Sequence, residues 1–186
     1  MELFPTPAFG LFNGWLLAAV LYLVFGILLL LFPRPVVARL YDRSLEEGRR
    51  TLERLLGLLL FLGWMLLAIV TPLSHVQGVL RPGLALYALG FLGFVAALRT
   101  YAATPVDRPV ATGLYRLSRH PQQCMLWLSF LGISIAMGSW IAVVVIGIGL
   151  VGAHRKVVAE EEACLRRYGE PYRQYLERVP RYFLLR

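Results

Sequence analysis

Long apolar runs separated by short charged segments dominate the chain. Residues 8–32 carry no charged side chain and end before a proline, and residues 55–71 form a second uncharged run that also ends before a proline. A third run covers residues 83–98. A helix needs about 20 largely apolar residues to cross a bilayer, and somewhat fewer when its ends snorkel. Each run therefore predicts a transmembrane helix.

The last apolar run, residues 125–153, is too long for a single span, and Gly138 and Ser139 interrupt it near the middle. This pattern favours two short helices folded back as a hairpin. The predicted fold class is an all-α, polytopic integral membrane protein with about five transmembrane helices. Residues 1–98 would hold the N-terminal helices with a loop at 33–54, and residues 99–186 would hold a polar loop, the hairpin and a polar tail.

Composition supports a membrane protein, because 58% of the 186 residues are hydrophobic and only 16% are charged, with a mean hydropathy of +0.64. A soluble domain of this size would need more charge to cover its surface. The first apolar run lacks a basic segment before it and a small-residue cleavage site, so we expect a retained helix and not a cleaved signal. Cys124 and Cys164 are too few for a disulfide framework and are expected to be free thiols.

Basic residues orient the chain, since Lys and Arg accumulate in cytoplasmic loops. In the predicted topology, 18 of the 19 lie on one side and only Arg81 lies on the other. We therefore expect an integral protein of a bacterial or archaeal inner membrane, with its N-terminus outside and its C-terminus in the cytoplasm. The same rule, with attraction to anionic lipids, explains the net charge of +8 without a nucleic-acid partner. The loop at residues 34–50 mixes both signs and is interpreted as an interfacial helix without chemistry.

Two polar segments, residues 107–123 and 154–183, flank the predicted hairpin. An antiparallel hairpin would bring both to one cytoplasmic mouth, so that His120 approaches the Glu160 region and a composite pocket forms. Prolines and a glycine interrupt the first segment. Its backbone N–H and C=O groups could bind the adenine and ribose of a nucleotide-like cofactor, with Tyr115 as an aromatic face. For His120 or Arg119 taken alone, a belt at the lipid headgroups is the favoured alternative.

The second segment places Lys156, Glu160 and Cys164 on one helical face by their spacing of four. Lys156 and Glu160 could simply form an ordinary ion pair along a helix. The run of carboxylates at residues 160–162 repels itself beside an anionic lipid surface, so at least one should have a cationic partner. Either the ammonium or sulfonium of a ligand or a nearby arginine could serve.

Taken together, the "GLYRLSRHP" segment, the apolar hairpin, "EE" and "YGEPYRQYLERVPR" resemble the C-terminal signature of the isoprenylcysteine carboxyl methyltransferase family and the related phospholipid methyltransferases. The resemblance covers residues 107–182. It implies S-adenosylmethionine as the cofactor and a lipophilic methyl acceptor, either an isoprenylcysteine-like carboxylate or a lipid amine. The implied cofactor-binding residues are Val110, Tyr115, His120, Pro121, Gln122, Gln123 and Glu160.

Lys156 falls where the family usually carries an arginine that faces the substrate, and Arg155 could compensate for this change. Gln123 and Met125 stand where the family usually has an aromatic residue and a glycine. The implied reaction is in-line attack of an acceptor nucleophile on the sulfonium methyl group, which requires no metal; the acceptor would arrive from the bilayer and the cofactor from the cytoplasm. The tail also resembles the end of membrane sterol reductases, so a reductase that binds NADPH is one alternative. A non-enzymatic membrane scaffold, which would bind neither cofactor, is another.

Overall fold

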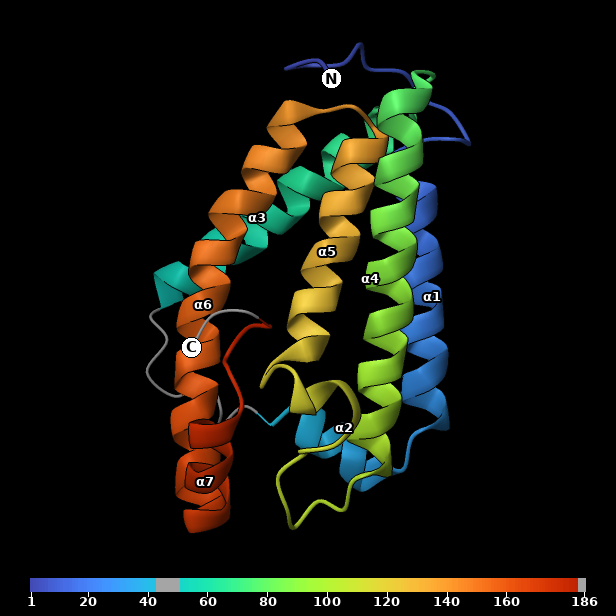
Figure 1. Ribbon diagram of the computed structural model, residues 1–186. Coiled ribbons are helices and arrows are strands. Elements are labelled where there is room, and N and C mark those ends of the chain that lie inside the picture. The colour runs from blue at the N-terminus through green and yellow to red at the C-terminus, as the bar shows by residue number, and fades with distance from the viewer. Residues whose placement is uncertain (43–50, 184–186) are drawn as a thin grey trace.

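Seven α-helices and one short 3-10 helix form the described part of the chain, residues 1–42 and 51–183, in the computed structural model (Figure 1). The fold is all-helical, as predicted. Their bounds are α1 Gly14–Leu31, α2 Arg34–Leu40, α3 Thr51–Val70, α4 Gln77–Ala103, η2 Gly113–Arg116, α5 Pro121–Ala136, α6 Trp140–Tyr168 and α7 Glu170–Arg178. Only α2 represents the predicted interfacial helix at 34–50, and residues 43–50 of that prediction lie outside the described residues.

Four helices, α1, α3, α4 and α6, are long and apolar enough to cross a membrane, which indicates an integral membrane protein. The predicted hairpin is confirmed: α5 and α6 are separated by a turn in which Gly138 has a φ of 68°. A side chain is disfavoured at that φ, so glycine suits the turn. The 16 residues of α5 rise only about 24 Å, less than the thickness of a hydrocarbon core. The hairpin therefore has one long and one short arm.

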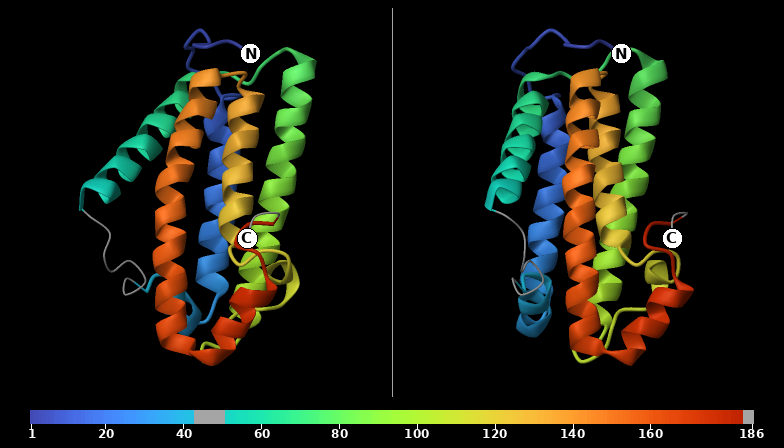
Figure 2. Two further views of the ribbon diagram at one scale, coloured as in Figure 1. Left: turned by 60° about the vertical axis from the view of Figure 1, so that its left-hand side comes forward. Right: turned by 90° about the vertical axis from the view of Figure 1, so that its left-hand side faces the viewer.

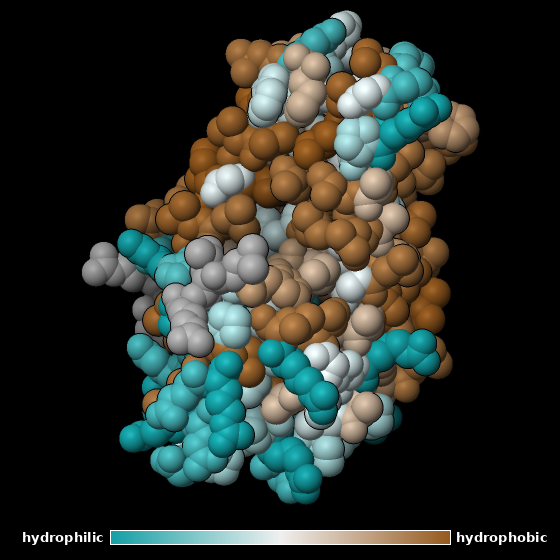
Figure 3. Space-filling view, viewed as in Figure 1, coloured by the Kyte–Doolittle hydropathy of each residue, from teal (hydrophilic) through white to brown (hydrophobic). Residues whose placement is uncertain are grey.

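The surface separates into an apolar body and a charged end. Hydrophobic side chains cover most of the helical body in Figure 3; hydrophilic ones form a small group at the end near the N-terminus and a larger group at the end that holds α2 and α7. We call the end that holds α2 and α7 the charged end. A 30 Å hydrocarbon core accommodates about 20 helical residues, so α6, which has 29, extends out of it. For a span that begins at Trp140, the part of α6 after about residue 159 would lie outside the membrane at the charged end.

Helices α4 and α5 pack backbone to backbone. A Cβ atom added to Gly132 of α5 would lie 2.3 Å from the backbone nitrogen of Tyr87 in α4, and one added to Gly83 would lie 2.4 Å from the nitrogen of Ala136. Such distances leave no room for any side chain. By contrast, α3 lies beside α6 at one end and leans away from it toward the charged end, as the left view of Figure 2 shows.

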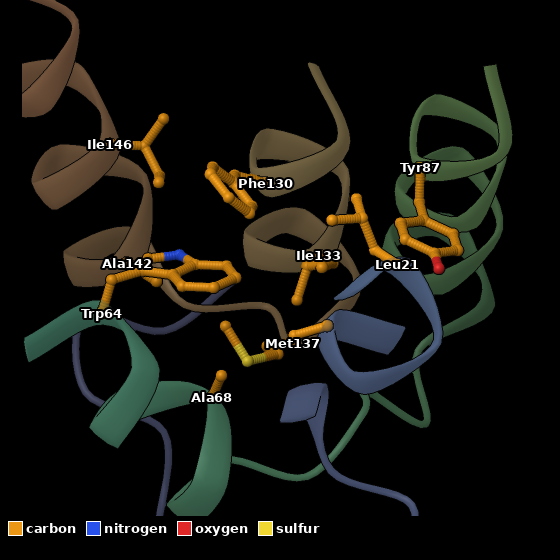
Figure 4. Packing of buried hydrophobic residues seen from close by; sticks show 10 residues of the cluster. Leu21, Trp64, Ala68, Tyr87, Phe130, Ile133, Met137, Ala142 and Ile146 are labelled. Atoms are coloured by element: carbon orange, nitrogen blue, oxygen red, sulfur yellow. The ribbon is translucent and has the colours of Figure 1, made fainter. Parts of the chain in front are cut away.

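The core lies between α1, α3, α5 and α6, where Trp64, Phe130, Ile133 and Met137 pack together (Figure 4). The indole Nε1 of Trp64 donates a hydrogen bond of 2.9 Å to the hydroxyl of Ser134, which satisfies a buried donor. The N-terminal segment crosses the outside of the hairpin turn (Figure 1). Its Glu2 donates a backbone hydrogen bond to the carbonyl of Gly138 and accepts one from the N–H of Trp140.

Candidate functional site

The loop before α5 is fastened to the C-terminal tail. The backbone N–H and the Nε of Arg119 donate to the carbonyls of Pro180 and Val179, at 3.0 and 2.8 Å. The hydroxyl of Ser118 donates to the carbonyl of Arg181 at 2.8 Å. Pro121 begins α5 at the first helical position, where its missing N–H has no intrahelical partner to lose. The predicted meeting of the two polar segments is confirmed by these contacts.

A buried group of charges lies where the loop, the tail and α6 meet. The carboxylate of Glu161, only 6% exposed, accepts hydrogen bonds from Arg119 at 2.7 Å and from Arg181 at 2.7 and 3.1 Å. The His120 Nε2 lies 3.3 Å from the same carboxylate. We call Arg119, His120, Glu161 and Arg181 the Glu161 cluster. Burial alone would raise the pKa of Glu161, but hydrogen bonds from His120 and Arg181 and the charge of Arg119 bring it down to about 2.

The three consecutive glutamates have three different environments, because successive residues of a helix point about 100° apart. Glu160 is partly exposed and its carboxylate lies 3.8 Å from the His120 Nδ1. Glu161 is buried, whereas Glu162 is exposed to solvent. Arginines, Arg119 and Arg181, supply the cationic partner that the acidic run was expected to need.

A polar cavity of about 440 Å³ lies between α1, α2, α4, α5 and α6. Four of the predicted site residues line it: Gln122, Gln123, Lys156 and Glu160. The remaining lining residues are Leu21, Tyr22, Phe25, Arg39, Leu40, Tyr41, Asp42, Phe94, Leu98, Tyr101 and Leu126. It contains carboxylates, cationic side chains, amides and aromatic rings, which suits a ligand of mixed polarity.

Four other predicted residues, Val110, Tyr115, His120 and Pro121, do not line this cavity. Two of them contact residues that do. The hydroxyl of Tyr115 donates to the Gln122 side chain at 3.2 Å, and burial raises the pKa of Tyr115 well above its usual value, so the phenol stays a neutral donor. Together with the contact of His120 and Glu160, this makes the loop a support behind the cavity wall. The walls of the polar cavity come mainly from helices, whereas the sequence suggested a pocket formed by the loop and the tail.

Sequence reasoning missed the contribution of α2. The loop at 34–50 was expected to carry no chemistry, yet Arg39 and Asp42 both line the polar cavity. Asp42 is also bound to Arg167 near the end of α6, at 3.1 Å. The sequence offered one signal. Arg39 has apolar neighbours on both sides, which is a pattern compatible with a buried basic residue. The two cysteines, Cys124 and Cys164, are free thiols, as predicted.

An apolar cavity of about 630 Å³ lies mainly between α3, α5 and α6. Its lining is aliphatic and aromatic except for a few polar residues, among them Glu53 and Arg155, which form an ion pair between α3 and α6. The two cavities share four lining residues: Tyr22, Gln123, Leu126 and Lys156. They therefore adjoin, and a polar ligand in one could meet an apolar ligand in the other.

Residues 83–171 match the family model described as phospholipid methyltransferase. The match contains α5 and α6 completely and most of α4, whereas α1, α2 and α3 precede it. This match confirms the predicted resemblance to phospholipid methyltransferases, and that family implies a membrane methyltransferase that acts on lipid. The resemblance to isoprenylcysteine carboxyl methyltransferases stays a prediction. No curated protein and no solved structure matches the chain.

Proposed function

We propose that the protein is an S-adenosylmethionine-dependent methyltransferase that acts on a lipophilic acceptor. The observation that carries this proposal is the pair of adjoining cavities. A methyl donor with charged and aromatic parts suits the polar cavity, and the hydrocarbon part of the acceptor suits the apolar one. Transfer requires the two ligands to meet, and the four shared residues mark where they would.

The residues of the polar cavity fit this cofactor. The cavity volume of about 440 Å³ is in the range of small-ligand pockets. The carboxylate of Glu160 lies 3.8 Å from the His120 Nδ1 and is suited to an ammonium group. The rings of Tyr41 and Phe94 offer apolar surface for adenine. When bound, S-adenosylmethionine would supply an electrophilic methyl group on its sulfonium.

The chain itself would bind, orient and dehydrate the reacting groups. The apolar cavity excludes water from the hydrocarbon part of the acceptor, which strengthens the electrostatic interactions nearby. Lys156 and Gln123, at the junction of the cavities, would orient the acceptor nucleophile. For a carboxylate acceptor, the ammonium of Lys156 offers a matching charge. An amine acceptor would have to bind in its neutral form. Arg155, already paired with Glu53, would support the acceptor at the charged end.

Binding titrations on the detergent-purified full chain test this proposal. We expect S-adenosylmethionine to bind and NADPH not to bind. Glu160→Gln should weaken cofactor binding by roughly 1.5–3 kcal/mol, because it removes a charge-assisted contact. Glu162→Gln is the matched control, since it makes the same chemical change on an exposed neighbour, and should leave the affinity unchanged. Binding of NADPH alone would favour a reductase, and binding of neither compound would favour a scaffold.

A further inference from the structure

Arg39 is the most deeply buried cation beside the polar cavity. The residue is 6% exposed, and it lies on α2, outside the part of the chain that matches the family model. Its two terminal nitrogens donate to the backbone carbonyls of Tyr101, Thr104 and Pro105, at 2.7, 3.3 and 3.0 Å. Its guanidinium stacks over the Tyr101 ring at 4.1 Å. These contacts fix the side chain in one position.

The charge of Arg39 is only partly compensated. Within the described residues, no carboxylate lies within 4 Å of its guanidinium, and its Nε is buried without a hydrogen-bond partner. The carbonyl end of α4 contributes roughly half of a negative elementary charge. A buried cation that is left without a counter-charge is unfavourable. This arrangement therefore favours an anion in the neighbouring cavity.

Two carboxylates face the same cavity: Asp42, which is bound to Arg167, and Glu160 on another helix. Arg39 lines it from α2 and Glu160 lines it from α6, and neither of them lines the apolar cavity. A cation and a carboxylate on two walls of one small cavity are complementary to a zwitterion, which carries both charges in one group. An α-amino acid moiety, with its ammonium and carboxylate on one carbon atom, has that chemistry.

We infer that Arg39 binds the carboxylate of the amino-acid moiety of S-adenosylmethionine, while Glu160 binds its ammonium. This inference rests on the proposed function and adds to it a cofactor-binding residue from the N-terminal half of the chain. The guanidinium is pre-organised by its three carbonyl contacts, so little side-chain entropy is lost when the carboxylate binds. Helix α2 is then a wall of the cofactor site and not merely an interfacial segment.

A cofactor analogue that lacks only the carboxylate tests the inference directly. The dissociation constants of S-adenosylmethionine and of decarboxylated S-adenosylmethionine are measured by calorimetry on the purified full chain. The wild type should bind the complete cofactor about 10- to 100-fold more tightly than the analogue. Arg39→Gln should weaken binding of the complete cofactor by that factor and leave binding of the analogue unchanged. The preference for the carboxylate should therefore disappear in this variant.

Two further variants control for folding and for charge in general. Arg39→Lys keeps the cation and should retain part of the preference, which provides a reading even if Arg39→Gln does not fold. Arg34→Gln removes an exposed charge from the same helix and should retain all of it. Melting temperatures of all variants show whether any change in affinity reflects loss of the folded state.

Three outcomes would overturn the inference. If Arg39→Gln weakens binding of both compounds equally, the residue only supports the fold. If the variant keeps the wild-type preference but loses co-purified anionic lipid, the anion at Arg39 is a headgroup phosphate. If the wild type binds both compounds equally, no residue reads the carboxylate. A wild type that binds neither compound would instead contradict the proposed function itself.

Discussion

Two pairs of helices in this protein are packed in opposite ways. Helices α4 and α5 touch through glycines, with no space for a single added carbon atom at Gly132. Helices α3 and α6 diverge toward the charged end and leave an apolar cavity between them. The first pair is a rigid wall that fixes the residues at the start of α5. The second pair leaves space of a size and polarity suited to a hydrocarbon chain. One side of the bundle is therefore closely packed, and the other side contains the cavity.

The Glu161 cluster holds α6 against the loop before α5 at the charged end, where α3 leans away from α6 (Figure 2). The separation of α3 and α6 at this end should therefore depend on the cluster. Glu161→Gln should destabilise the protein by about 3–5 kcal/mol, since it leaves the Arg119 side chain, which is 9% exposed, without its counter-charge. Glu162→Gln should change stability by less than about 0.5 kcal/mol. Chemical denaturation of both variants in the same detergent measures this. Equal effects would show that α6 is held by other contacts.

The same cluster predicts a pH dependence with a definite sign. The pKa of Glu161 is lowered from 4.5 to about 2 in the folded chain, so its contribution to stability is complete above pH 4.5. That contribution should be lost progressively as the pH falls from 4.5 toward 2. The Glu161→Gln variant should lack this part of the acid transition, and an unchanged transition would contradict the assignment.

Gly132→Ala tests the close packing of α4 against α5. The added methyl group would meet the backbone of α4, which has no flexible atom to yield, so we expect a loss of about 1–3 kcal/mol. Gly63→Ala on α3 is the matched control, because no atom lies within 4 Å of its added Cβ. That change should be neutral or stabilise α3 by up to about 1 kcal/mol. Melting temperatures that move together would mean that the two helix pairs are equally compliant.

Leu60→Trp tests the apolar cavity between α3 and α6. Among these substitutions, it should have the smallest effect on stability, within about 0.5 kcal/mol. Leu60 lines the apolar cavity, so a larger ring should occupy space meant for the acceptor. The lipid concentration that gives half-maximal methyl transfer, measured with a membrane lipid extract, should rise about 10-fold, with unchanged affinity for S-adenosylmethionine. Leu59→Trp is the control, since Leu59 is 64% exposed on the same helix. Similar kinetics for both variants would exclude the cavity as the acceptor site.

Local sequence patterns predicted the elements well. Apolar runs marked all four long helices, because the need for a continuous apolar stretch is set by the bilayer and not by tertiary contacts. Gly138 marked the hairpin turn because few other residues tolerate its φ of 68°. The side of the membrane on which the charged end lies follows from the basic residues alone and stays a prediction.

The site was harder to predict because it depends on contacts between distant segments. The helical period shows that Glu160, Glu161 and Glu162 diverge, but which one is buried depends on where the loop and the tail pack against α6. Arg39 acts through carbonyl groups 62 to 66 residues further along the chain. No local pattern encodes such a contact, so α2 was taken for a surface element. The motif residues were placed near the site, but several support its wall instead of lining it.

The N-terminal segment has a consequence for how the protein is made. Glu2 leaves the ribosome before any of the described helices, yet its hydrogen-bond partners are Gly138 and Trp140 on the hairpin turn. During synthesis the first three long helices are complete while Glu2 still lacks these partners, and the hairpin closes the bundle only after its turn has left the ribosome. A bulky group attached beside Glu2 would therefore disturb the last step of assembly and leave the insertion of α1 intact.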